Sequence, residues 1–303
     1  MRWPRPSSSP PRRRSPRLAA ALAAWAAISC SLPFLPAPTL RVGLEPLRDL
    51  TPVSWAVEQA DAASPHLLAV EIGRVTAGEF QAPLWYAAFR PFRPDRPRAL
   101  ILAGVRGNDR GAVQAALDLL RDLAAAPGDY AAWDLDLLPL VNPWGFVHDR
   151  SENAYGIDID RDFSQFRSPE ARLLRKFLRE KRYDLVVELR EDPGARGFAI
   201  GLTGAQDRTP ATRLIERMRE AGFPVASDAF FFLGPREGVA HTPLWGLKIL
   251  GWFRQGTLGG YLRERVSPGV FALVTPREAP LEERVAMHRL AIAGLLGVAE
   301  GQP

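Results

Sequence analysis

Long apolar runs with little alternation recur along the chain, and each predicts a buried strand of a sheet that is covered on both faces. These runs occupy residues 99–105, 133–141, 184–191, 197–204 and 269–278. Two further apolar segments, 66–73 and 83–90, flank RVTAGEFQA, which we expect to be the connection of a hairpin.

Helical periodicity fills most of the intervals between these runs. The clearest case is 111–126, in which Val113, Ala116, Leu117, Leu120 and Ala124 form one apolar stripe before Pro127-Gly128. Ser168, Pro169 and Glu170 supply an N-cap, an N1 proline and an acidic first turn for a helix to about Lys181. Further helices are expected at 209–222 and 281–298, so the alternation predicts an α/β sandwich around a parallel or mixed sheet.

The stretch 141–163, VNPWGFVHDRSENAYGIDIDRDF, differs from all of these segments. The NPWG sequence follows an apolar run and predicts a turn at the end of a strand. IDIDRDF alternates apolar and charged residues, which indicates a short, exposed, extended segment. The density of turn formers and charges makes this stretch the first candidate for a functional site.

The amino terminus accounts for the positive charge of the chain. The 303 residues carry a net charge of +5, but six arginines and no acid precede residue 30. An apolar run of 11 residues, 18–28, follows these arginines, as the h-region of a signal peptide follows its n-region. We therefore expect an export segment rather than a nucleic-acid partner.

Cys30 is the only cysteine and directly follows the apolar run, so no intrachain disulfide can form. The sequence AISC is similar to a bacterial lipobox, which implies lipidation at Cys30, a membrane anchor and a location in the cell envelope. A cleaved signal peptide, an uncleaved anchor and a cytoplasmic chain are the alternatives. The expected organisation is an export segment at 1–30, a proline-rich tether at 31–44 and a single domain at 45–300.

The stretch 141–163 resembles the NPDG…R.N…G.DLNR.F signature of the zinc carboxypeptidase family, which includes carboxypeptidase A-like enzymes and murein peptide amidases. The resemblance extends over about residues 80–298. It implies a three-layer α/β sandwich with a mixed, largely parallel central sheet, and a zinc-dependent peptidase site.

The zinc-ligand positions implied by this resemblance are occupied by Arg106, Asp109 and Arg190. Arginine stays protonated and has no lone pair for a metal ion. The remaining histidines, at positions 66, 148, 241 and 288, lack HxxH or HExxH spacing. We therefore expect no zinc cofactor, and an ion-pair cluster in its place.

Other positions retain the family pattern. Arg161 matches the arginine that grips the substrate carboxylate, Asp160 replaces the neighbouring asparagine, Glu278 matches the general base, and Tyr261 matches a mobile substrate tyrosine. Each has a structural alternative: Asp109 as a helix N-cap, Glu278 as an exposed loop acid, and Arg161 as a partner of nearby aspartates. Aromatic residues between 229 and 256 are expected to be core or to line a specificity rim.

Three functions are compatible with this sequence. The first is a non-catalytic binder of peptide or peptidoglycan fragments that carry a free carboxylate. The second is an active metallocarboxypeptidase or amidase with unusual ligands, and the third is a structural envelope protein with a filled cleft.

Overall fold

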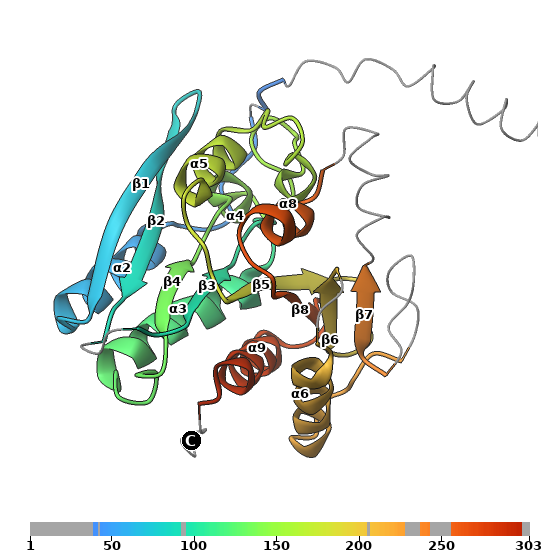
Figure 1. The fold of residues 1–303 in the computed structure, drawn as a ribbon. Helices are drawn as coiled ribbons and strands as arrows, with labels where there is room; N and C mark the ends of the chain where they lie inside the picture. Colours follow the sequence, from blue (N-terminus) through green and yellow to red (C-terminus); the bar gives the residue numbers. More distant parts are fainter. Residues whose placement is uncertain are drawn as a thin grey trace, which may run out of the picture. The chain divides into compact units, whose positions relative to one another are not determined.

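A mixed eight-stranded sheet is the framework of the part of the chain that the structure describes (Figure 1). The strand order is β1-β2-β4-β3-β5-β8-β6-β7. The strands are β1 (Leu67–Ala77), β2 (Phe80–Phe89), β3 (Arg98–Leu102), β4 (Asp134–Leu138), β5 (Leu185–Asp192), β6 (Ala199–Thr203), β7 (Val239–Thr242) and β8 (Val270–Pro276). Strands β4, β3, β5 and β8 are parallel neighbours, whereas β1, β2 and β6 join by antiparallel pairing. This confirms the predicted α/β fold with a mixed sheet.

Helices cover both faces of the sheet and complete three layers (Figure 1). One face packs against α2 (Thr51–Ala63), α3 (Arg110–Ala125), α6 (Thr209–Glu220) and α9 (Leu281–Leu296). The other face packs against α5 (Pro169–Leu178) and α8 (Leu258–Arg265). Two short elements, α4 (Pro143–Val147) and the 3₁₀ helix η1 (Ile159–Arg161), follow β4 in the sequence and precede α5.

The structure is a computed structural model, and it describes residues 39–41, 43–91, 95–204, 207–227, 237–242 and 256–298. The described residues belong to one compact unit that begins at Pro38. The export segment, Cys30 and all six aromatic residues of 229–256 lie outside the described residues. No helix in the described ranges has the length and apolarity needed to cross a bilayer.

Residues 40–44 belong to this unit, although we expected them to be part of a tether. The Arg41 N–H donates to the Ala154 carbonyl at 2.8 Å, and Leu40 and Leu44 pack beside Trp144. These contacts join residues 40, 41 and 44 to the segment around Trp144 and Ala154.

The hairpin connection is shorter than predicted. Strand β1 continues to Ala77 and β2 begins at Phe80, so most of RVTAGEFQA pairs as strand. Gly78 lies in the turn between the two strands and has a φ of +62°, a backbone conformation that residues other than glycine disfavour.

The structure of 141–163 also differs from our expectation. NPWG forms the helix α4 instead of an open turn, with the Asn142 side chain accepting from the Gly145 N–H at 2.9 Å. IDIDRDF contains the short η1, and its residues Ile159 and Phe163 are buried instead of exposed. The cause is pairing outside the segment: Asp162 accepts from both the N–H and the hydroxyl of Ser168.

Candidate functional site

The parallel strands bring the sequence-predicted residues to one edge of the sheet. Strands β3 and β5 are parallel neighbours, so the segments that follow their carboxyl ends lie at the same edge. Arg106 and Asp109 follow β3, and Arg190 lies near the end of β5. The loop after β3 packs directly on α4, because a Cβ on Gly107 would lie 2.1 Å from the Gly145 carbonyl carbon.

Arg190 is committed to buried carboxylates. Its Nη2 donates to Asp160 Oδ2 at 2.8 Å, and its Nε lies 3.5 Å from Glu188 Oε1. Burial opposes the charge of Arg190, but Asp160 and Glu188 raise its pKa overall. Burial would raise the pKa of Asp160, yet Arg190 and Arg106 hold it below its usual range. This part of the site is a cluster of buried ion pairs.

Glu188 is a member of this cluster that our sequence analysis missed. Its side chain is 2% exposed, and Oε1 accepts no hydrogen bond from any described residue. Burial raises its pKa to about 7, against the opposing effect of Arg190. A signal was present: Glu188, Arg190 and Asp192 alternate along the carboxyl half of β5, so they share one face of the strand.

Asp109 pairs with an arginine that we did not predict. Its Oδ1 accepts from Arg277 Nη2 at 2.6 Å, and the same nitrogen lies 3.3 Å from the Glu191 carbonyl oxygen. Asp109 occupies the N-cap position of α3, but its side chain makes no capping hydrogen bond. Burial raises the pKa of Asp109 to about 7, although Arg277 lowers it.

A second buried acid, Glu191, lies beside the Asp109–Arg277 pair and is bonded to α9. Glu191 accepts from the Gly111 N–H at 2.6 Å and from Arg284 Nη1 at 2.5 Å. Together with Asp109 and Arg277 it joins the start of α3 to α9 and to the loop after β8. Arg277, which contacts both the Asp109 carboxylate and the Glu191 carbonyl, links the two acids.

Arg106 has looser contacts than the other cluster arginines. Its Nη1 lies 4.0 Å from Asp192 Oδ2, and its side chain is 22% exposed. It nevertheless lies within electrostatic reach of four acids, because it lowers the pKa of each. These acids are Asp109, Asp158, Asp160 and Glu188.

Three positions that match the family pattern, Arg161, Tyr261 and Glu278, lie outside the buried ion pairs of Arg190. Arg161 is 61% exposed, and its Nε lies 3.6 Å from Asp158 Oδ2. Tyr261 belongs to α8, and its ring packs 5.3 Å from the Phe163 ring between centroids. Glu278 is exposed in the turn after β8, and no ion pair joins it to a described residue. The structure brings Asp160 to Arg190 but does not pair Glu278 with either arginine.

The histidines do not gather at this edge. His148 Nδ1 lies 3.1 Å from the Glu45 carbonyl oxygen, His241 Nε2 lies 2.8 Å from that of Gly204, and His288 Nε2 lies 3.2 Å from Thr275 Oγ1. Glu152, four residues after His148, pairs with Arg41 at 3.6 Å. Among the described residues, no group of three His, Cys, Asp or Glu side chains is placed to hold a metal ion.

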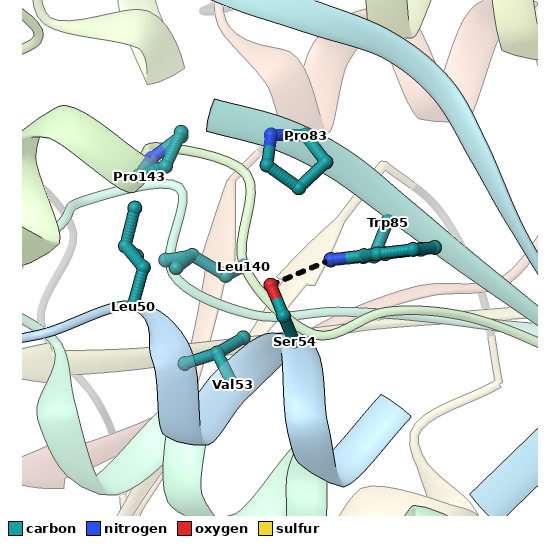
Figure 2. A pocket seen from close by; sticks show the side chains of 7 residues that line it. All are labelled: Leu50, Val53, Ser54, Pro83, Trp85, Leu140 and Pro143. Carbon is teal, nitrogen blue, oxygen red and sulfur yellow. Dashed lines mark hydrogen bonds between the residues drawn. The ribbon is translucent and has the colours of Figure 1, made fainter. Parts of the chain in front are cut away.

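A small apolar pocket near α4 does not compete with this site. It is lined by Leu50, Val53, Ser54, Pro83, Trp85, Leu140 and Pro143 (Figure 2). Its volume of about 10 Å³ leaves room for about one water molecule. The Trp85 Nε1–H donates to Ser54 Oγ at 3.1 Å, which ties β2 to α2 across the pocket (Figure 2).

Comparison with solved structures confirms the fold. A candidate metallopeptidase from Shewanella denitrificans superposes with a TM-score of 0.67 at 19% identity, covering 82% of this chain and 90% of that one. A metallo-carboxypeptidase from Burkholderia cenocepacia gives 0.59 at 17% identity, covering 81% and 67%. Carboxypeptidase A from Helicoverpa armigera gives 0.61 at 13% identity, covering 94% and 81%.

No protein-family model and no curated protein sequence matches the chain. The chain thus has the zinc carboxypeptidase fold, as its sequence resemblance predicted. At these identities the comparison establishes the architecture alone, and activity has to be argued from the site.

Proposed function

We propose that this protein is a member of the zinc carboxypeptidase family that holds no zinc and does not hydrolyse peptides. In this proposal it binds peptide or cell-wall fragments through a free carboxylate. The observation that carries it is the ion pair between Arg190 and Asp160, 2.8 Å long and buried, at a position where the family has a metal ligand.

The side chains present do not fit a zinc ion. A catalytic zinc needs three ligands that each supply a nitrogen, oxygen or sulfur lone pair, and an open position for water. Arg106 and Arg190 offer only N–H donors, and the third residue, Asp109, is engaged by Arg277 at 2.6 Å. A metal ion would also meet two guanidinium groups at close range, and their charges would repel it.

The same charges favour an anionic ligand. Guanidinium groups bind carboxylates through paired N–H donors, and Arg161 is exposed at the rim of the cluster. They do not acidify a bound water as zinc does, so the cluster supplies binding and orientation but no metal-activated nucleophile.

The first experiment measures metal content, cleavage and binding on the full-length protein. We expect less than about one zinc per ten chains by elemental analysis, no C-terminal cleavage of peptides, and binding of free-acid peptides that Arg161→Gln weakens. Stoichiometric zinc with chelator-sensitive cleavage would identify an active peptidase instead. Zinc-free protein with no affinity for any free-acid peptide would point to the structural envelope role.

We also propose that the protein is exported and anchored in a membrane through lipid on Cys30. The support is the arginine-rich start, the apolar run at 18–28 and the position of Cys30 directly after it. Intact mass measurement of membrane-extracted protein tests this. We expect a lipid-modified chain beginning at Cys30, and in Cys30→Ser a loss of that modification. An unprocessed chain of full mass in the wild type would contradict it.

A further inference from the structure

The cluster arginines differ in what they leave free for a ligand. Arg190 is 13% exposed and lies between Asp160 and Glu188, which occupy its guanidinium. Arg277 is 22% exposed, but its Nη2 is already bonded to Asp109 and its Nε is buried. A ligand that bound the Nη2 group of either arginine would have to displace a buried carboxylate, which is strongly unfavourable.

Arg106 has no such commitment within the described residues. Its nearest carboxylate oxygen, on Asp192, is 4.0 Å away, which is beyond hydrogen-bonding distance. Its guanidinium makes no hydrogen bond to another described residue, and none of its nitrogens is sealed from solvent without a partner. The Arg106 guanidinium has five N–H groups and its side chain is 22% exposed, so it can donate hydrogen bonds to a ligand.

The surroundings of Arg106 connect it to the rim. Asp158 is affected by both Arg106 and Arg161, each of which lowers its pKa against the larger effect of burial. Asp158 therefore lies within reach of both guanidinium groups, and its contact with Arg161 Nε is a loose 3.6 Å. Both guanidinium groups therefore act on one carboxylate at this edge of the sheet, and neither donates a hydrogen bond to a carboxylate of the described residues.

We propose that Arg106 is the main anchor of the ligand, donating two parallel hydrogen bonds to its carboxylate, with Arg161 closing over it from the rim. Arg190 instead acts as an internal counter-ion that holds Asp160 and Glu188 and does not touch the ligand. This inference rests on the proposed function and adds to it the residue that replaces the metal as the ligand's positive partner.

The test uses the full-length protein and a panel of N-acetylated tripeptides, each prepared as the free acid and as the C-terminal amide. Calorimetry should show that the wild type prefers the acid. Arg106→Gln should weaken acid binding by about 10-fold to 100-fold, as expected for a charge-assisted pair, and leave amide binding unchanged. Arg106→Lys should restore only part of this, because an ammonium group lacks the planar fork.

Arg110→Gln is the matched control, since Arg110 is exposed, begins α3 and lies four residues away. It should bind like the wild type. Thermal melts must show that the Arg106 variants are folded, and Arg106→Lys serves as the readout if Arg106→Gln is not.

The outcomes separate the two proposals. A wild type that prefers the acid, and loses this preference in Arg161→Gln but not in the folded Arg106 variants, overturns the role of Arg106 and leaves the proposed function standing. A wild type that does not distinguish acid from amide overturns both.

Discussion

Asp136 shows how much one buried charge can organise in this protein. It is 1% exposed in β4, and its two oxygens accept from Tyr86, Arg90, Lys181 and Tyr183, with the Tyr183 hydroxyl at 2.5 Å. Burial alone would raise the pKa of Asp136, but these donors hold it below its usual range. One carboxylate thereby joins β2 and β4 to the segment between α5 and β5.

Replacing Asp136 by asparagine should therefore be costly. Arg90 and Lys181 would lose their shared counter-ion, and an amide group would meet donors with a donor of its own. We expect a loss of about 3–5 kcal/mol in the free energy of unfolding, measured by urea denaturation. Asp134→Asn is the control, since Asp134 starts the same strand and its side chain makes no hydrogen bond or ion pair with a described residue. Equal losses in the two variants would contradict a special role for Asp136.

The regular elements were predictable because their own residues determine them. The helix expected at 111–126 is α3, and the one expected at 281–298 is α9, each within two residues at both ends. The predicted N-cap at Ser168 is also confirmed, since its hydroxyl accepts from the Ala171 N–H at 3.2 Å. Apolar periodicity and capping act over a few residues, and the sequence displays them directly.

Elements that depend on distant partners were not predictable. η1 was expected to be exposed because three aspartates and an arginine lie within IDIDRDF. Asp160 is nevertheless buried, because Arg190, 30 residues away, balances its charge. Helix α8 and strand β7 were not predicted at all, since they are short and their apolar faces are small.

The candidate site divides in the same way. The resemblance placed Arg106, Asp109, Asp160 and Arg190 at one edge, and the structure brings Asp160 and Arg190 into contact. It did not disclose that Asp109 pairs with Arg277 across 168 residues. A family pattern identifies positions, whereas ion pairs depend on which side chains the topology brings together.

At the scale of the whole molecule, buried ionisable groups link folding to proton binding. Burial raises the pKa of Asp109, Glu170 and Glu188 to about 7 in each case. Each therefore keeps a proton in the folded protein at pH values where the unfolded chain has released it. His288 acts in the opposite direction, because burial lowers its pKa to about 3 and keeps it neutral where the unfolded chain is protonated.

The sign of the pH dependence follows from these two sets of groups. Between about pH 5 and 6.5, folding takes up about three protons at the acids and excludes about one at His288, a net uptake of about two. Stability therefore falls as pH rises through this window, and above it the acids continue the loss until they are ionised in the folded state as well. The carboxylates whose pKa is lowered, Asp136 and Asp160, affect stability only below their usual range.

We accordingly expect a larger free energy of unfolding at pH 5.5 than at pH 7.5, measured by urea denaturation at constant ionic strength. Glu170→Gln isolates one contributor away from the arginine cluster, because Glu170 lies in α5 and, among the described side chains, accepts a hydrogen bond only from Asn153, at 2.8 Å. Since glutamine mimics the protonated acid, this variant should flatten the pH dependence by about one proton. Glu282→Gln, at an exposed position of α9, should leave the slope unchanged. A wild type that becomes more stable between pH 5.5 and 7.5, or a Glu170→Gln slope equal to that of the wild type, would show that these acids are ionised in the folded protein.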